Sequence, residues 1–152
     1  MLRERLNEEL KLAMKAKDSR VVSTVRLILA ALKDRDIAAR GKDRTEGIDE
    51  NEILQMLQTM VKQRRESIAQ YEKGGRLDLV QKEEAELAVL RRFLPQPLTE
   101  GEIRDLIQSS IDQLGAKGIQ DLGRVMKQIM PQVTGRSDGK RVNELAREML
   151  GT

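Results

Sequence analysis

Hydrophobic residues recur every three or four positions along almost the whole chain, and no segment sustains the period-two alternation typical of a β-strand. The first such stripe places Leu2, Leu6 and Leu10 on one side of a helix. The pattern therefore predicts an all-α protein. Its N-terminal part is predicted to form about four helices, over residues 2–17, 19–39, 49–73 and 77–94.

Several residues mark the ends of these helices. Asp49 followed three residues later by Glu52 is typical of a capping box, which predicts the start of the third helix. Gly74 and Gly75 end that helix, and Pro95 disfavours helical backbone at Leu94, where the fourth is predicted to end. Residues 95–98, with two prolines, are predicted to form a stiff linker.

Beyond this linker the pattern predicts a tail of three shorter helices. Thr99 and Glu102 form a second capping-box pattern at the start of the first, and Gly115 ends it. The second is expected over residues 121–130, stopping at Pro131, and the third over residues 139–150. We therefore expect a helical N-terminal domain over residues 1–94 and a three-helix domain over residues 99–152.

The composition removes most catalytic chemistry. The 152 residues include no histidine and no cysteine, which excludes disulfides, thiolate nucleophiles, imidazole bases and the triads built on them. Carboxylate, lysine and tyrosine chemistry remain, but no catalytic residue can be assigned. We expect neither a cofactor nor a metal. With only Tyr71 and Phe93 as aromatic residues, the chain lacks a group of aromatic side chains on which RNA bases could stack. Any contact with RNA must therefore depend on the shape and the phosphates of the RNA.

Membrane association is not expected either. The longest apolar stretches are broken by charged residues within a few positions, so no run of about 20 apolar residues exists to cross a bilayer. Charged residues occur from the third position of the chain onward, and residues 1–6 lack the apolar region of a secretory signal peptide. These features lead us to expect a cytoplasmic protein.

Charge is unevenly distributed along the chain. The formal net charge is +3; residues 1–95 carry 20 Lys/Arg against 17 Asp/Glu, whereas residues 115–152 carry seven against four. The positive charge is therefore denser toward the C-terminus. Two charged runs within predicted helices, Lys62–Ser67 and Glu83–Glu86, offer a basic patch and a carboxylate cluster, but consecutive helix positions point apart, and both runs are typical of solvated helix faces.

The most distinctive local feature is the basic turn, Gly135–Arg141, which sets two glycines and three cations between two predicted helices. Glycines four apart allow backbone amides to face outward and receive an anion. The alternative is a plain helix connection, in which glycine ends one helix and Ser137 or Asp138 caps the next. The run differs from a nucleotide P-loop, because the spacing is too short and Arg141 stands where Ser or Thr is required.

A second candidate lies just upstream, around Gly123. A glycine within a helix costs about 1 kcal/mol relative to alanine, so its presence indicates the close approach of another backbone or of a ligand. Arg124 and Lys127 share one face of this helix. The alternative is a tight helix crossing with ordinary surface charges. We mark Gly123, Gly135 and Gly139 as structural turn positions.

Taken together, motifs dispersed along the chain resemble the GatB/YqeY family, and in particular its free-standing YqeY-like branch. In the tail these motifs are Asp121–Met126, Pro131, Gly135–Lys140 and Asn143–Leu145. In the N-terminal part they are Leu6–Lys11, Lys15–Asp18, Thr24–Leu27, Val61–Ile68 and Leu94–Leu98. The resemblance covers essentially the whole chain.

This resemblance implies a tail similar to the end of the B subunit of the glutamine-dependent aminoacyl-tRNA amidotransferase, where the tail helps to hold tRNA. The family carries the label of a carbon–nitrogen ligase with glutamine as amido-N donor, but the kinase-like body that performs the activation is absent from these 152 residues. The expected function is therefore a non-catalytic tRNA-binding module. The alternative is a protein-interaction module that docks on an amidotransferase or an aminoacyl-tRNA synthetase.

The expected RNA-binding face combines the two basic segments of the tail. Arg136 and Lys140 match the basic turn of the family, and the remaining members are assigned by inference from charge and spacing. The full set is Arg124, Lys127, Arg136, Lys140 and Arg141.

Overall fold

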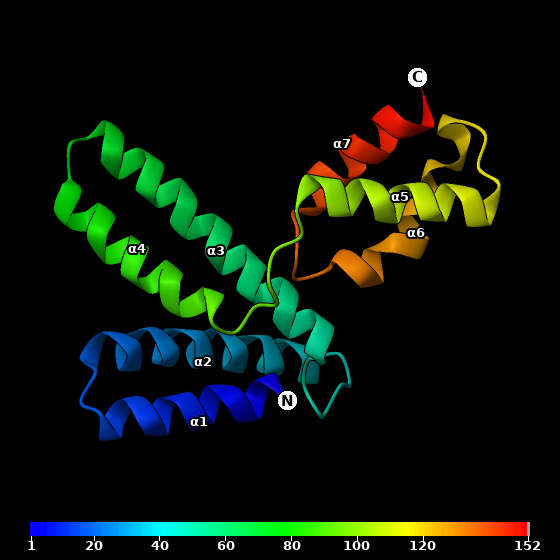
Figure 1. The fold of residues 1–152 in the computed structure, drawn as a ribbon. Coiled ribbons are helices and arrows are strands. Elements are labelled where there is room, and N and C mark those ends of the chain that lie inside the picture. Colours follow the sequence, from blue (N-terminus) through cyan, green and yellow to red (C-terminus); the bar gives the residue numbers. More distant parts are fainter. Residues whose placement is uncertain (152) are drawn as a thin grey trace. The chain divides into compact units, whose positions relative to one another are not determined.

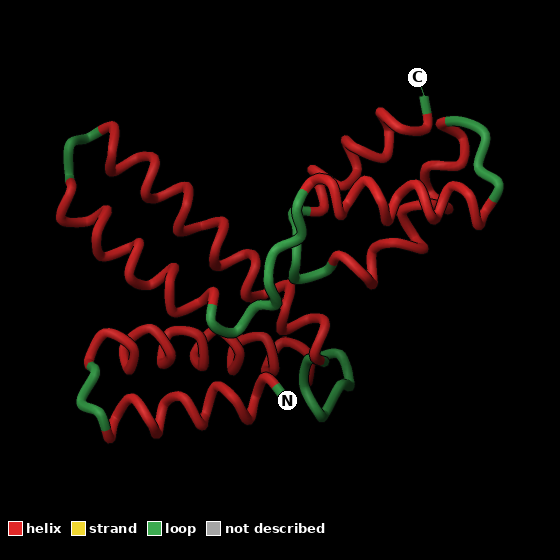
Figure 2. The backbone as a smooth tube through the Cα atoms, viewed as in Figure 1, coloured by secondary structure: helices red, strands yellow, loops and turns green. Residues whose placement is uncertain are grey.

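The structure, a computed structural model, describes residues 1–151, and within them it consists of α-helices, one short 3-10 turn and connecting loops (Figures 1 and 2). The all-α prediction is confirmed. The elements are α1 (Leu2–Lys15), α2 (Ser19–Arg40), α3 (Glu50–Lys73), α4 (Leu77–Arg91), α5 (Glu100–Leu114), η1 (Ile119–Asp121), α6 (Leu122–Val133) and α7 (Gly139–Leu150). The chain divides into two compact units, Met1–Pro95 and the residues from Gln96 onward.

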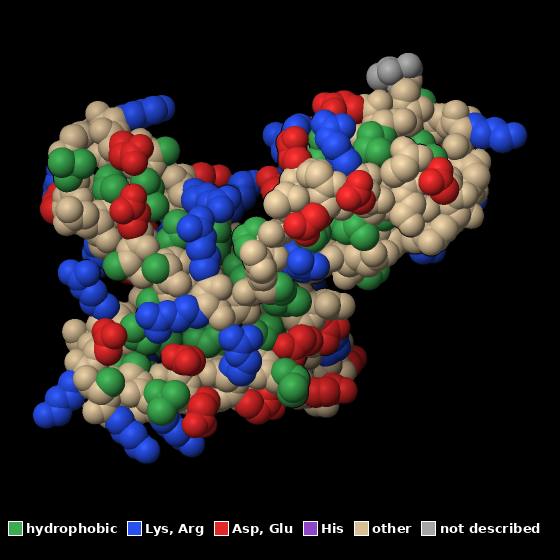
Figure 3. All heavy atoms as spheres, viewed as in Figure 1, with side chains coloured by type: hydrophobic (Ala, Val, Ile, Leu, Met, Phe, Trp, Pro, Cys, Tyr) green, Lys and Arg blue, Asp and Glu red, His purple; other side chains and the backbone are tan. Residues whose placement is uncertain are grey.

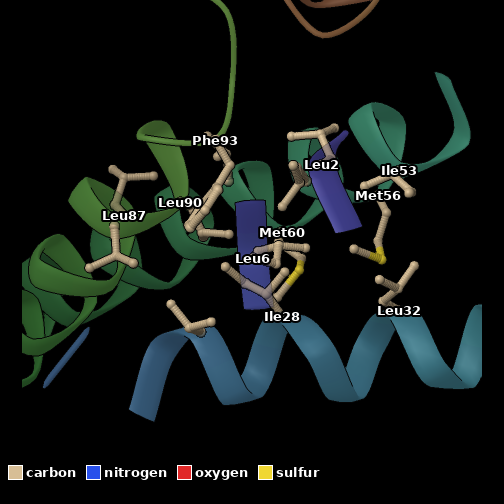
Figure 4. Packing of buried hydrophobic residues seen from close by; sticks show 14 of the residues in the cluster. Leu2, Leu6, Ile28, Leu32, Ile53, Met56, Met60, Leu87, Leu90 and Phe93 are labelled. Carbon is tan, nitrogen blue, oxygen red and sulfur yellow. The ribbon is translucent and has the colours of Figure 1, made fainter. Parts of the chain in front are cut away.

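The first unit is built from two antiparallel helix pairs, α1 with α2 and α3 with α4 (Figure 1). Helix α2 packs against all three other helices, so it forms the centre of the unit. Its side chains Ile28 and Leu32 meet residues of α1, α3 and α4, among them Leu6, Met60 and Leu90 (Figure 4). Each of these buried side chains contributes roughly 1.5–3 kcal/mol of hydrophobic stabilisation.

The second unit is a three-helix arrangement in which α5, α6 and α7 each contact the other two. Its core consists of fully buried aliphatic residues contributed by all three helices: Ile107, Val125, Ile129, Val133, Val142, Leu145 and Ala146. The core contains no aromatic side chain, because the chain has none beyond Phe93. No helix within residues 1–151 combines the length and apolar character needed to span a membrane.

Several predicted helix ends are confirmed at atomic level. The Glu52 N–H donates to Asp49 Oδ1 over 2.9 Å, and the Asp49 N–H donates to Glu52 Oε1 over 3.3 Å, which completes the capping box of α3. Thr99 accepts the Glu102 N–H at the start of α5, over 3.1 Å. Gly115 ends α5 in the left-handed conformation, at φ +63°.

Two predicted ends are wrong. Helix α4 ends at Arg91 rather than Leu94, because the next residues tighten into turns that bring Phe93 into the core, where only 1% of it is exposed. Helix α6 passes through Pro131 and ends at Val133. Proline lacks one N–H, but it lies in the last turn of α6, and burial of Val133 favours continuation of the helix.

The two charged runs are not simply solvated helix faces. Arg64 on α3 and Glu86 on α4 turn toward each other, with 3.3 Å between Nε and Oε2, and their side chains are only 14% and 15% exposed. Each run thus contributes one residue to an ion pair between helices. Because Arg64 and Glu86 are 22 positions apart, local spacing did not reveal the pair.

A polar cluster joins α1, α2 and the loop before α3. The Arg3 guanidinium donates to both carboxylate oxygens of Asp36, each over 2.7 Å, and to the Ile48 carbonyl over 2.8 Å. The Ile48 N–H donates to Asp36 Oδ1 over 3.0 Å. These hydrogen bonds, that of Arg3 above all, lower the pKa of Asp36 from 3.8 to about 2.

We expect this cluster to make the first unit acid-sensitive. A lowered folded-state pKa stabilises the protein above the unfolded value, and this stabilisation is lost as the pH falls from about 4 to about 2, at a cost of about 2 kcal/mol. Urea unfolding at several pH values should show that the Asp36→Asn variant lacks this part of the pH dependence. Equal losses in the variant and the parent protein would contradict the assignment to Asp36.

Candidate functional site

The backbone of the basic turn forms a helix connection. Gly135 takes φ +81°, and the Arg136 and Ser137 N–H groups both donate to the Val133 carbonyl, over 2.9 and 3.1 Å. Asp138 then caps α7 by accepting the Lys140 N–H over 3.1 Å. These N–H groups serve as helix caps, as the helix-connection alternative predicts, and anion binding at this segment stays a prediction.

Arg136 also holds the start of the second unit in place. Its carbonyl accepts the Leu98 N–H over 2.8 Å, and its Nε donates to the Gln96 carbonyl over 3.1 Å. The linker segment after Pro95 is thereby tied to the basic turn. No local pattern in the sequence indicates this contact, because the two hydrogen-bonded segments are about 40 residues apart.

Two of the five candidate cations are paired with carboxylates. Arg141 donates to Glu100 through Nε, over 2.8 Å, and through Nη2, and to Glu144 over 3.1 Å through Nη1. The bond to Glu100 is the main reason why the pKa of Arg141 is raised. Arg124 donates to Asp121 over 3.0 Å and to the Leu114 carbonyl over 3.2 Å. Both side chains thus stabilise packing within the unit.

The other three candidates have no carboxylate partner within residues 1–151. Lys127 on α6 and Lys140 on α7 are exposed and form no ion pair with the described chain. Arg136 is half-buried and bonds only to a carbonyl through its side chain. Among the five candidates, the positive charge available to a ligand is therefore carried by Lys127, Arg136 and Lys140.

The glycines marked as turn positions differ in their surroundings. Gly135 alone among them takes a positive φ. Gly139 is the first residue of α7, and a Cβ there would lie 3.7 Å from Met130 Cε. Gly123 lies in the first turn of α6, and a Cβ there would meet nothing within 4 Å, so the tight helix crossing considered for this position is wrong.

The second unit as a whole carries no excess of positive charge. From Gln96 onward the sequence has eight Lys/Arg and eight Asp/Glu, because the acidic residues of α5 balance the basic residues that follow. Figure 3 shows the two kinds of side chain interspersed over the visible face of this unit. The net charge of +3 belongs to the first unit. Among residues 1–151, no three acidic side chains are grouped so as to hold a metal ion.

Curated relatives match most of the chain. A protein of Pyrenophora tritici-repentis is 30% identical over 150 residues, which cover 97% of this chain and 80% of that protein. A protein of Lachancea thermotolerans is 34% identical over 111 residues, covering 72% and 57%, and one of Saccharomyces cerevisiae is 29% identical over 138 residues, covering 87% and 70%. All three are named "Altered inheritance of mitochondria protein 41, mitochondrial".

These names contradict the expectation of a cytoplasmic protein, since the relatives are mitochondrial. The expectation rested on the lack of an apolar targeting region and of a membrane-spanning segment. Neither feature distinguishes the cytoplasm from the interior of an organelle, because soluble proteins of both have the same balance of apolar and charged residues.

The family model also agrees with the motifs in the sequence. The model described as "Yqey-like protein" matches residues 3–150, so both units are included. The resemblance to the GatB/YqeY family, based on motifs from Leu6 to Leu145, is confirmed by this match. The chain belongs to the YqeY-like protein family.

Proposed function

We propose that the second unit is a non-catalytic module that contacts the phosphates of a structured RNA, with tRNA as the expected partner. The observation that carries the proposal is the presence of three cations without carboxylate partners, Lys127, Arg136 and Lys140, at and near the turn that matches the family motif. The resemblance to the tRNA-holding tail of the amidotransferase B subunit supports tRNA as the ligand.

The chemistry of the unit favours contact with the RNA backbone over contact with bases. No aromatic residue occurs from Gln96 onward, so bases have no side chain on which to stack. Lysine and arginine side chains bind phosphate oxygens through charge-assisted hydrogen bonds. Recognition would therefore depend on the shape of the RNA and on the salt concentration.

The number of candidate cations without a carboxylate partner sets the expected salt dependence of RNA binding. Each phosphate neutralised contributes roughly 0.7–0.9 to the slope of log K against log salt, so three contacts give a slope of about 2–3 in magnitude. The other two candidates, Arg124 and Arg141, are paired within the unit and add little. Binding to RNA is therefore expected to be weak at physiological salt.

Two adjacent residues supply a matched test. Lys140→Ala and Arg141→Ala remove the same charge from the same turn, but Lys140 has no ion pair and Arg141 is held by Glu100 and Glu144. We expect Lys140→Ala to lower the salt slope of tRNA binding by about 1 and Arg141→Ala to leave it nearly unchanged. The measurement is fluorescence anisotropy of labelled tRNA across a range of KCl concentrations.

The double variant Lys127→Ala with Lys140→Ala extends this test, with an expected decrease of about 2 in the slope. Arg136 is left in place because it also holds the Gln96 carbonyl, so its loss would disturb the fold of the unit. An unchanged slope in the double variant, or equal effects of Lys140→Ala and Arg141→Ala, would exclude these side chains as the RNA contact.

A further inference from the structure

The first unit has a groove along one side of the α1–α2 helix pair. The groove consists of two separate shallow hollows, one including Met14 and Arg26 and the other including Asn7 and Lys33. Arg26 and Lys33 are seven residues apart on α2, and Asn7 and Met14 are seven apart on α1, so each pair shares one face of its helix. We call the two hollows together the hairpin groove.

Cations stand at regular intervals along this groove. Arg26, Lys33 and Arg40 repeat every seven residues on α2, which places them about 10.5 Å apart along the helix axis. All three are exposed, and within residues 1–151 none of them forms an ion pair. The carboxylate in the groove, Asp36, is bonded to Arg3 on both oxygens.

Hydrophobic side chains lie between the cations. Met14, Leu27 and Ile37 are 52%, 44% and 54% exposed, and they account for three of the seven large hydrophobic residues exposed in the described chain. Figure 3 shows Lys and Arg side chains together with hydrophobic and acidic ones over α1 and α2. The combination of exposed apolar side chains with evenly spaced cations that form no ion pair distinguishes this groove from an ordinary solvated helix face.

We propose that the hairpin groove binds an acidic amphipathic helix of a partner protein. Apolar residues of that helix, three and four positions apart, would cover Met14, Leu27 and Ile37, while Asp or Glu residues seven apart would meet the cations of α2. The distance from Arg26 to Arg40 is about 21 Å, which requires about four turns of helix. This proposal is independent of the RNA contact in the second unit.

The groove is better matched to a protein than to RNA. Burial of exposed methionine, leucine and isoleucine side chains is favourable against another apolar surface, and a phosphate backbone offers none. Base stacking would require aromatic side chains, and the groove is lined by none. The charge complementarity therefore indicates carboxylates on a partner helix.

The test uses the full chain and a fluorescein-labelled helical peptide of about 21 residues, with leucines spaced three and four apart and glutamates at the flanking positions. The analogue with lysine in place of each glutamate is the control peptide. We expect the glutamate peptide to bind, and Arg26→Ser with Lys33→Ser to weaken it about tenfold in low salt. Lys62→Ser with Arg65→Ser removes the same charge from exposed positions of α3, outside both hollows, and should have little effect.

Methyl NMR of the same samples locates the binding site, since shifts of the Met14, Leu27 and Ile37 methyl signals are expected on addition of the glutamate peptide. Equal binding of both peptides, or equal effects of the two serine pairs, would overturn the proposal. Two other results of the Arg26→Ser with Lys33→Ser variant would also overturn it. A lower salt slope of tRNA binding, with unchanged peptide binding, would assign the groove to RNA. Loss of a concentration-dependent dimer would assign the groove to a second copy of this chain.

Discussion

Replacing Glu86 by glutamine is expected to lower the free energy of unfolding of the first unit by about 3 kcal/mol. The substitution keeps the size of the side chain but leaves the Arg64 guanidinium, only 14% exposed, without its counter-charge. Arg64 Nε has no hydrogen-bond partner in the described chain, so the negative charge of Glu86 is the main interaction that stabilises the positive charge of Arg64. Tyrosine fluorescence during urea unfolding follows this unit specifically, because Tyr71 on α3 is the only tyrosine.

Two further variants separate the ion pair from the general effect of removing charge. Glu84→Gln changes an exposed residue of the same acidic run and should alter the stability by no more than about 0.5 kcal/mol. Arg64→Leu with Glu86→Leu should recover most of the loss, because a hydrophobic pair carries no desolvation penalty. If Glu86→Gln and Glu84→Gln had the same effect, the ion pair of Arg64 with Glu86 would not stabilise the first unit.

Gly47→Ala is expected to destabilise the first unit by about 3 kcal/mol. Gly47 has φ +81°, and an added Cβ would lie 2.3 Å from Asp36 Oδ1 and 3.1 Å from Arg3 Nη2. The carboxylate cannot move away without losing hydrogen bonds to Arg3 or Ile48. The substitution therefore adds backbone strain and also disrupts the polar cluster that joins α1 to α2.

Gly75→Ala is the matched control. Gly75 also has a positive φ, +69°, but a Cβ there would meet nothing within 4 Å. Backbone strain alone should cost about 1 kcal/mol, so the difference between the two variants measures the clash with the Asp36 cluster. Equal losses in urea unfolding, again followed through Tyr71, would show that Asp36 yields to the new methyl group without cost.

The features that were predicted correctly depend on residues close together in the sequence. The Asp49–Glu52 capping box and the Gly115 helix end need only three or four neighbouring positions, because the backbone groups that they satisfy lie within one helical turn. Helix stripes follow from a period of 3.6 residues. The error at Pro131 has the opposite origin, since burial of Val133 in the core outweighed a local stop signal.

The candidate site shows where this local information ends. Lys140 and Arg141 are adjacent and carry the same charge, yet only Arg141 has carboxylate partners, one of which is Glu100, 41 residues away. In the same way, the contact of Arg136 with Gln96 depends on how the second unit folds.

The sequence by itself determined the helices, most of their caps, the family and the absence of histidine and cysteine chemistry, because these depend on composition and on spacing within a few residues. Only the tertiary structure decided which cations remain free for a ligand. Ion pairs and hydrogen bonds act over a few ångströms in space, so the charge available at a surface depends on how distant helices pack.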